Sequence, residues 1–303
     1  MQAFLFSIVV LVWGLTWYAI HLQLGTTPDV VSIFWRFALA VVILWGGLVV
    51  TKRLKPVRWR QHGWFIILGI TLFSCNFMLF YEAEKTVPSG LVSVIFSMAT
   101  IFNALNQWAF KGIKPSWRVL SGAVMGVAGV VCLFADQLSL TTHRAELTGI
   151  LLSLAGTYSF SLGNLASARA TATGVDLPNA VVRGISWGVI LLAGVIMLQG
   201  HSFLPVATKQ YLAGLVYLSV FGTIIGFLAY LWLVAKMGPA KAAYTTVLSP
   251  IVAVAVSVVL EHLSWTLANF AGVVLVLCGN MVIFTPPAVF KRLCFWQNRK
   301  ILS

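Results

Sequence analysis

The chain has 303 residues, of which 60% belong to the hydrophobic set AVILMFWYC and only 9% are charged. Soluble domains average about 25% charged residues, and a soluble chain of this length could not cover so much apolar surface. Twenty Lys and Arg residues stand against seven Asp and Glu, which gives a formal charge of +13. The composition excludes a soluble domain and predicts a polytopic membrane protein.

Ten apolar stretches follow one another along the chain. About 20 residues are enough for a helix to cross a bilayer core of roughly 30 Å. The stretches fall at residues 2–22, 30–50, 62–81, 88–110, 116–134, 147–169, 178–199, 209–235, 240–260 and 265–285. The first has no basic segment before it and no convincing cleavage site, so we take it as a helix and not as a secretory signal. We therefore predict an all-α integral membrane protein with ten transmembrane helices.

Basic residues gather on one side of this predicted topology. With the N-terminus inside, fifteen lie on the inner side, namely Lys52, Arg53, Lys55, Arg58, Arg60, Lys111, Lys114, Arg118, Arg169, Lys236, Lys241, Lys291, Arg292, Arg299 and Lys300. The outer side has Lys85, Arg144 and Lys209, together with every acid except Asp176. Cytoplasmic loops hold the excess of Lys and Arg, so we expect both termini in the cytoplasm and the chain in the inner (plasma) membrane of a bacterium. An inner balance of +14 suits anionic lipid, and we expect no nucleic-acid partner.

Matching residues recur in the two halves of the chain. Pairs at offsets of 147 to 151 residues are Arg36 and Arg183, Lys85 and Lys236, Pro88 and Pro239, Gly122 and Gly272, and Gly129 and Gly279. An odd number of helices per unit makes the second unit enter from the opposite side, an arrangement that places a shared binding site near the midplane. We predict two inverted five-helix repeats around a central cavity, at residues 1–140 and 141–285, followed by a basic cytoplasmic tail at 286–303.

Several short motifs resemble those of a known transporter family. They are Trp13-Gly14-Leu15-Thr16-Trp17, the Arg-led run from Trp35 to Ala40, the segment from Phe80 to Gly90, and Leu248-Ser249-Pro250-Ile251. Over residues 2–285 the chain resembles the ten-span drug/metabolite transporter superfamily, EamA branch, which includes YddG-type aromatic amino acid exporters. The resemblance implies alternating-access transport of a small metabolite, most simply export of neutral or aromatic amino acids. We expect no cofactor and no enzymatic activity.

Polar stripes on two helices are the main candidates for the substrate site. Helix 4 carries Ser89, Ser93, Ser97, Thr100 and Gln107 on one side, with Asn103 beside them. Helix 6 carries Thr157, Ser161 and Asn164, with Tyr158 adjacent. Such stripes either line a cavity or form hydrogen bonds between helices. The length of the first favours a cavity, whereas the second fits both interpretations equally.

Aromatic residues and one proline complete the predicted site. Trp13 and Trp17 lie deeper than interfacial tryptophans and could form a cage for a cation. Pro250 leaves the Thr246 carbonyl without its helical donor, so that carbonyl could accept a hydrogen bond from a substrate ammonium, or from Ser249 or water. The full set of predicted substrate-binding residues is Trp13, Thr16, Trp17, Asn76, Tyr81, Ser93, Ser97, Thr100, Asn103, Tyr158, Ser161, Tyr230, Tyr244 and Pro250.

The sequence indicates structural roles for the charged residues within or near the predicted spans. Arg36 and Arg183 lie roughly 9 Å inside their helices, and anchoring at the interface is favoured over carboxylate binding. Proton pumps usually need an intramembrane carboxylate, but no Asp or Glu lies near the middle of a span. Glu82 and Glu84, at the outer end of helix 3, are expected in a solvated loop. The sequence therefore favours facilitated, gradient-driven movement over proton antiport.

Three further interpretations remain open from the sequence. Trp13 and Trp17 would suit an importer of a small organic cation such as a quaternary amine. Gly184-Ile185-Ser186-Trp187-Gly188 has the spacing of a serine hydrolase motif, but that motif requires a strand-turn-helix elbow and a nearby base. A receptor or scaffold is disfavoured by the repeat and the polar stripes.

Gly122 and Gly126 form a GxxxG motif that serves either packing inside one chain or a homodimer face.

Overall fold

The chain folds into a bundle of helices in a computed structural model that describes residues 2–25, 27–133, 144–237, 244–262 and 266–284. The first half contains α1 (Gln2–His21), α2 (Asp29–Val50), η1 (Trp59–Gln61), α3 (His62–Ile70), η2 (Thr71–Cys75), α4 (Asn76–Ala83), α5 (Ser89–Phe96), α6 (Ala99–Lys111) and α7 (Trp117–Leu133). The second half contains α8 (Arg144–Ala172), α9 (Leu177–Leu198), α10 (Lys209–Val216), η3 (Tyr217–Ile225), α11 (Gly226–Met237), α13 (Tyr244–Leu260) and α14 (Leu267–Phe284). Within the described ranges there is no strand, so the predicted all-α class is confirmed.

Six helical stretches are long and apolar enough to cross a membrane. These are Gln2–His21, Asp29–Val50, Trp59–Ala83, Ser89–Phe110, Leu177–Leu198 and Lys209–Tyr230. Three shorter apolar helices cover Trp117–Leu133, Thr245–Leu260 and Leu267–Ile283. Together with the 29-residue α8, they overlap the ten stretches predicted from the sequence. The predicted basic tail, 286–303, lies outside the described residues.

Two of these stretches contain π-helical turns. Ser74 in η2 donates to the carbonyl of Gly69 over 3.0 Å, and Thr223 in η3 donates to the carbonyl of Leu218 over 2.8 Å. In each case the hydroxyl bonds a carbonyl five residues back, which matches the wider π turn. The two bonds are related by 149 residues along the chain. Such turns are rare and are frequent at functional sites.

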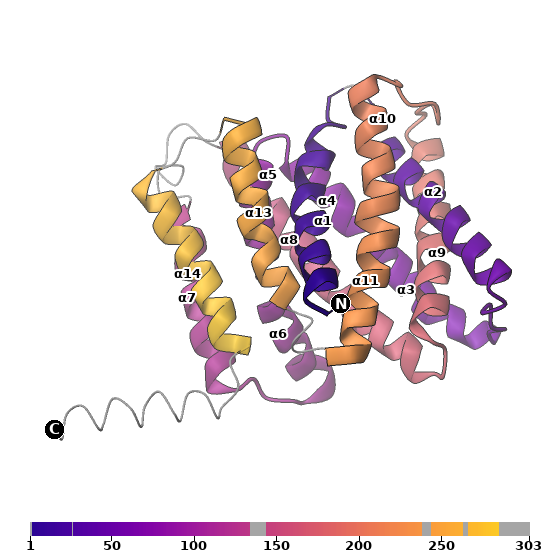
Figure 1. Cartoon of the computed structure of the whole chain (residues 1–303), viewed down its shortest axis with the longest axis horizontal. Coiled ribbons are helices and arrows are strands. Elements are labelled where there is room, and N and C mark those ends of the chain that lie inside the picture. The colour runs from indigo at the N-terminus through magenta and orange to yellow at the C-terminus, as the bar shows by residue number, and fades with distance from the viewer. Residues whose placement is uncertain (1, 26, 134–143, 238–243, 263–265, 285–303) are drawn as a thin grey trace.

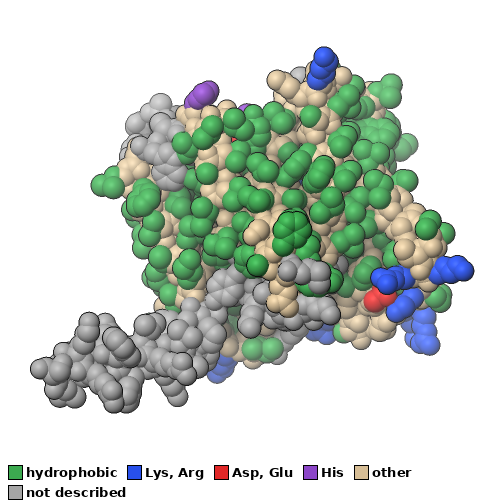
Figure 2. All heavy atoms as spheres, in the orientation of Figure 1, with side chains coloured by type: hydrophobic (Ala, Val, Ile, Leu, Met, Phe, Trp, Pro, Cys, Tyr) green, Lys and Arg blue, Asp and Glu red, His purple; other side chains and the backbone are tan. Residues whose placement is uncertain are grey.

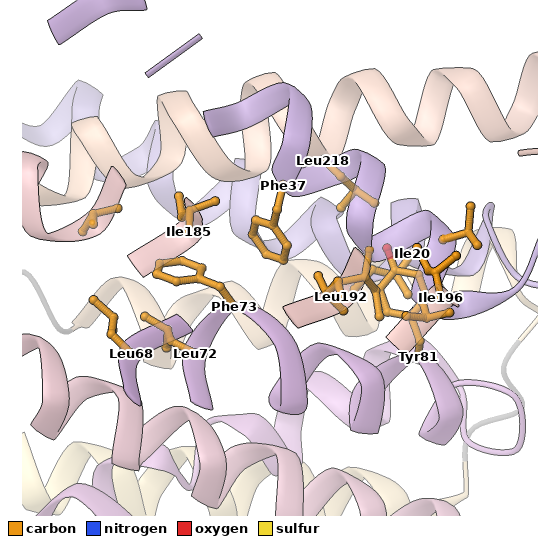
Figure 3. Packing of buried hydrophobic residues seen from close by; sticks show 14 of the residues in the cluster. Ile20, Phe37, Leu68, Leu72, Phe73, Tyr81, Ile185, Leu192, Ile196 and Leu218 are labelled. Carbon is orange, nitrogen blue, oxygen red and sulfur yellow. The ribbon is translucent and has the colours of Figure 1, made fainter. Parts of the chain in front are cut away.

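One cluster of buried apolar side chains joins α1, α2, α3, η2, α4, α8, α9 and η3. In Figure 3 Phe37 packs edge-on against Phe73, with ring centroids 5.5 Å apart. The outer surface is also apolar, and hydrophobic side chains cover the middle of the face in Figure 2 while Lys and Arg gather mainly at its lower edge. A soluble monomer rarely exposes so large an apolar surface, and a lipid-facing bundle requires it.

Glycines hold α7 against α14, which lie side by side in Figure 1. A Cβ added at Gly122 would lie 2.5 Å from the Gly279 carbonyl oxygen, and one at Gly129 would lie 2.7 Å from that of Gly272. The two helices are therefore antiparallel and nearly in backbone contact. Within this chain the GxxxG face already packs against another helix, as the first of its two interpretations requires.

Candidate substrate cavity

A cavity of about 780 Å³ lies among helices from both halves of the chain. Its walls come from α1, α2, η2, α4, α5, α6 and α7 in the first half, and from α8, η3, α11, α13 and α14 in the second. Eight predicted site residues line it, namely Trp13, Thr16, Trp17, Asn76, Thr100, Asn103, Ser161 and Tyr230. A volume of this size can enclose a small metabolite.

Three aromatic rings meet towards one end of the cavity. The ring of Trp17 lies 5.2 Å from that of Phe80 and 5.3 Å from that of Phe96, and the two Phe rings are 5.6 Å apart. At the opposite end, the wall is formed by the connection between α6 and α7, including Lys114 and Ser116. The cavity therefore extends from the aromatic triad of Trp17, Phe80 and Phe96 to the connection between α6 and α7.

Side-chain amides form a second part of the wall, between α6 and α8. Asn103 Oδ1 accepts hydrogen bonds from Ser161 Oγ at 2.8 Å and from Asn164 Nδ2 at 3.3 Å. Asn106 Nδ2 donates to Ser161 Oγ over 2.8 Å. In the helix 6 stripe, Ser161 and Asn164 thus both line the cavity and form hydrogen bonds with α6. Both interpretations of the stripe apply to these two residues.

The helix 4 stripe is divided by a break in the helix. α5 ends at Phe96 and α6 begins at Ala99. Ser93 and Ser97 donate to the carbonyls of Gly90 and Val94, three residues back, and such back-bonding bends helices. Thr100, Asn103 and Gln107 line the cavity, whereas Ser93 and Ser97 do not. A uniform 3.6-residue period misses this because the break rotates α6 relative to α5.

Other predicted site residues also lie away from the cavity. Tyr81 is buried behind the wall and donates to Gln23 Oε1 over 2.7 Å. Tyr158 is 41% exposed, and its ring contacts Phe102 on the outside of the bundle. Pro250 lies inside α13 but does not contribute to the wall, whereas Ser249 and Thr246 do. The side chain of Tyr244 lies outside the described residues.

Arg36 lies on the cavity wall, whereas the sequence favoured anchoring at the membrane interface. Together with Lys114 it is one of two charged residues on the described cavity wall, and none of the lining residues there is acidic. Its side chain is 4% exposed, so it does not extend to the membrane surface. The guanidinium stacks over the Phe77 ring at 4.4 Å, and Nε lies 3.4 Å from Thr223 Oγ1.

Several lining residues were not in the predicted set. They are chiefly Asn106, Gln107, Asn164, Ser249 and the rings of Phe77, Phe80, Phe96, Phe160 and Phe227. Gln107 and Asn164 belonged to the polar stripes, which was a usable signal. The Phe residues give no such signal in the sequence, because an apolar ring on a membrane helix can equally face lipid, the core or a cavity.

Glu84 is buried, contrary to the expected solvated position. It is 4% exposed, and neither carboxylate oxygen has a hydrogen-bond partner in the described chain. The neighbouring Lys85 pairs with Asp29 at 2.8 Å and Glu82 at 2.6 Å. Burial, reinforced by the negative charge of Glu261, raises the pKa of Glu84 well above its usual range. This carboxyl group is therefore the most strongly desolvated acid in the described loops.

The hydrolase-like motif has structural contacts inside α9. Ser186 Oγ donates to the Val182 carbonyl over 2.8 Å and accepts from Trp45 Nε1 over 3.0 Å. The motif therefore lies on a continuous helix, whereas a nucleophilic serine requires an elbow between a strand and a helix.

Relatives identify the class of protein. Over 92% of this chain and 91% of its own length, the "Uncharacterized inner membrane transporter YedA" of Escherichia coli is 25% identical. "Uncharacterized transporter YvbV" of Bacillus subtilis is 25% identical over 98% and 96% of the two chains, and the "Probable amino-acid metabolite efflux pump" of Escherichia coli is 23% identical over 90% and 91%. A crystal structure at 17% identity has the same fold, with a TM-score of 0.65 over 93% of this chain and 97% of the other.

The family assignment rests on both halves of the chain. The EamA-like transporter family matches residues 1–135 and again residues 147–285. Its members and the relatives above are named as transporters and not as enzymes. This agrees with the apolar surface, the membrane-length helices and the internal cavity. The chain is an integral membrane protein that belongs to the EamA-like transporter family.

Proposed function

We propose that this protein exports neutral or aromatic amino acids from the cytoplasm by alternating access. The carrying observation is the composition of the cavity wall, which combines aromatic rings, side-chain amides and a buried guanidinium with no acid among the described lining residues. Rings and amides suit the side chain and polar groups of an aromatic amino acid, and a guanidinium suits a carboxylate. Two relatives carry the name "Probable amino-acid metabolite efflux pump".

Within this proposal the ten helical stretches form two inverted five-helix repeats. The glycine contacts between α7 and α14 support it, because an exchange of the halves converts the pair Gly122 and Gly279 into the pair Gly272 and Gly129. The two π-helical hydrogen bonds, 149 residues apart, support it as well. So do the two separate matches to one family. The repeats would occupy residues 1–140 and 141–285.

The cavity suggests which state of the transport cycle is present. It reaches the connection between α6 and α7 at one end, and in this proposal the contacts within the aromatic triad form the barrier at the other. The charge pattern of the sequence assigns the first end, and both termini, to the cytoplasm. The structure then corresponds to an inward-facing state in the inner membrane, with its basic face on anionic lipid. Opening outward would require the three rings to separate.

An importer of a small organic cation is the weaker alternative. Trp13 and Trp17 do line the cavity, as a cation cage requires. However, Arg36 and Lys114 share that wall, and no described lining residue offers a negative charge. A positively charged quaternary amine would therefore enter a cavity whose charged side chains are also positive.

Reconstituted protein tests the proposal directly. Proteoliposomes are loaded with a mixture of amino acids and small amines without an ion gradient, and mass spectrometry identifies what leaves. We expect selective release of neutral or aromatic amino acids that exceeds release from protein-free vesicles. Selective release of amines alone would replace amino acid export with the cation function. Release only after an imposed proton gradient would contradict facilitated movement.

A further inference from the structure

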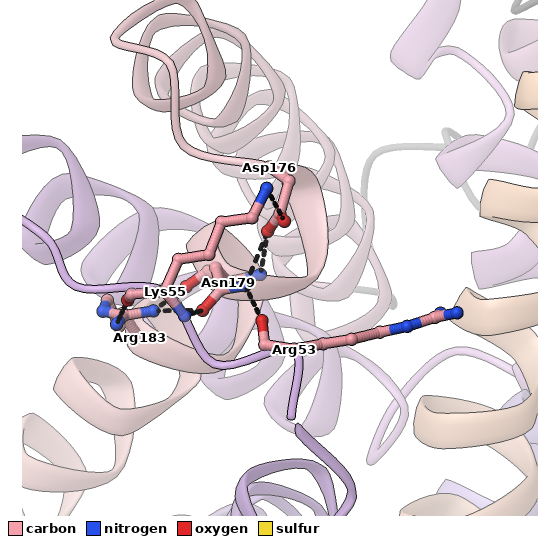
Figure 4. A network of polar contacts seen from close by, with 5 residues as sticks. All are labelled: Arg53, Lys55, Asp176, Asn179 and Arg183. Atoms are coloured by element: carbon pink, nitrogen blue, oxygen red, sulfur yellow. Dashed lines mark hydrogen bonds and ion pairs between the residues drawn. The ribbon is translucent and has the colours of Figure 1, made fainter. Parts of the chain in front are cut away.

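The two arginines that correspond between the halves have different surroundings. Arg183 donates through Nη1 to the carbonyl and side-chain oxygens of Asn179, both at 2.9 Å, and through Nη2 to the Lys55 carbonyl. Figure 4 shows this network, in which Asn179 also bonds Asp176 and the Arg53 carbonyl. Arg183 therefore joins α9 to the segment after α2, and its hydrogen-bonding capacity is used by the protein itself.

Arg36 has no such set of partners. Nε donates to Thr223 Oγ1 over 3.4 Å, the Tyr81 hydroxyl lies within hydrogen-bonding reach of the guanidinium, and Nη1 has no partner in the described chain. Tyr81 and Glu84 lie within electrostatic reach. Yet both Glu84 oxygens also lack a hydrogen bond, so no described carboxylate is bonded to this guanidinium. A buried cation without a bonded anion is costly, and its retention on a cavity wall requires an explanation.

The surroundings of Arg36 hold the guanidinium in place at the wall. The Phe77 ring lies 4.4 Å below it and the Phe37 ring 5.3 Å away. On the side of η3, a Cβ added at Gly222 would lie 3.8 Å from Nη2. Both Gly222 and Arg36 line the cavity. A flat, stacked guanidinium of this kind is suited to two parallel hydrogen bonds with a carboxylate.

We propose that Arg36 binds the carboxylate of the transported molecule, and that a carboxylate is required for transport. The inference rests on amino acid export and specifies how the substrate is recognised. Arg36 would fix the carboxylate near α2 and η3, while the side chain of the substrate lies among the rings of Trp13, Trp17 and Tyr230. Amines without a carboxylate are excluded because they cannot neutralise the guanidinium.

Three ligands that share a phenylethyl skeleton test this recognition on the wild-type protein. They are phenylalanine, 3-phenylpropionate, which lacks the amine, and phenethylamine, which lacks the carboxylate. Binding to purified protein is measured by quenching of tryptophan fluorescence, and efflux is measured from proteoliposomes. We expect both carboxylates to bind and phenethylamine to bind at least tenfold more weakly. Equal binding of phenethylamine would overturn the inference without any variant.

Variants then assign the effect to Arg36. Arg36→Gln should weaken binding of both carboxylates at least tenfold and abolish their preference over phenethylamine, and Arg36→Lys should retain part of that preference. Arg183→Lys is the matched control, and it should lower thermal stability but leave the order of the three ligands unchanged. If Arg36→Gln does not fold, the Arg36→Lys preference and the wild-type series decide the question.

The outcomes separate this inference from the proposed function. Unchanged phenylalanine efflux and ligand order in Arg36→Gln would overturn carboxylate binding by Arg36 and leave amino acid export in place. Wild-type protein that moves phenethylamine but neither carboxylate would overturn both. Wild-type efflux of the carboxylates with loss in Arg36→Gln, and no loss in Arg183→Lys, is the expected result.

Discussion

Trp13 donates its indole N–H to the carbonyl of Gly222 over 3.3 Å. This bond joins α1 of the first half to the π-helical segment η3 of the second, at the cavity wall. It requires close approach, because a Cβ at Gly222 would lie 2.7 Å from Thr16 Cγ2. The close approach of the two helices at this point thus depends on the absence of a side chain at Gly222.

Gly222→Ala should therefore reduce transport and stability together. Overpacking typically costs about 1–3 kcal/mol, and displacement of η3 would move Thr223, which accepts a hydrogen bond from Arg36 on α2. Thermal unfolding in detergent and efflux from proteoliposomes measure the two effects. Gly194→Ala is the control, because nothing lies within 4 Å of its added Cβ, and it should leave transport unchanged. Equal behaviour of both variants would contradict the packing argument.

Ser97 and Thr100 should give different phenotypes although both contact Asn280. Thr100 donates to Asn280 Oδ1 and also lines the cavity, while Asn280 Nδ2 donates to Ser97 Oγ over 3.0 Å behind it. Thr100→Val should lower transport several-fold. Ser97→Ala should cost about 0.6 kcal/mol, a typical value for a hydrogen bond between membrane helices, with transport intact. A larger transport defect in Ser97→Ala would place the site on α5.

The aromatic triad should control opening of the far end of the cavity. Phe96 contacts Trp17, Phe80 and Phe160, and aromatic pairs contribute about 0.5–1.5 kcal/mol each. Phe96→Ala should therefore shift the population outward. A single cysteine in place of the buried Gln23, in a background without native cysteines, would report this as faster labelling by an external impermeant maleimide. Leu105→Ala, on an exposed part of α6, should not change the labelling rate.

Glu84 should make stability depend on pH in an unusual direction. Its pKa is raised in the folded state, mainly by burial and then by Glu261, so ionisation opposes folding. The contribution of Glu84 to stability should be largest where its carboxyl group is protonated in both states, below about pH 4.3. This contribution should decline as the pH rises through the folded-state pKa. Other acids act in the opposite sense, so the comparison between variants is decisive.

Glu84→Gln isolates that contribution. It should raise the thermal stability at neutral pH and flatten the decline seen in the wild type, because the amide cannot ionise. Glu82→Gln, at an exposed position paired with Lys85, should change stability by no more than about 1 kcal/mol. A Glu84→Gln variant that is less stable at neutral pH would show that the carboxylate has a partner in the membrane.

Much of the architecture follows from the sequence because its signals are one-dimensional. The length of each apolar stretch matches a bilayer crossing, and basic residues such as Lys52 and Arg53 lie between the stretches. The glycines at 122, 129, 272 and 279 are visible as a spaced pattern. Composition and spacing were thus enough for an all-helical membrane protein, and the resemblance of its short motifs indicated a transporter family. The sequence also placed Trp13, Asn103 and Ser161 in a predicted set, and these three residues line one cavity.

The tertiary structure decided which side chains face the cavity and which are buried or paired elsewhere. The break at Ser97 and Met98 turned half of a polar stripe away from the cavity, and a fixed helical period cannot reveal that rotation. Glu84 looked like a loop residue because burial depends on neighbours far along the chain, such as Glu261. Arg36 and Arg183 are indistinguishable as sequence positions, one arginine in each half. Only the packing of the surrounding chain gives Arg183 its hydrogen-bond partners and leaves Arg36 on the cavity wall. Hydrogen-bond partners are set by distance in space and not by order along the chain.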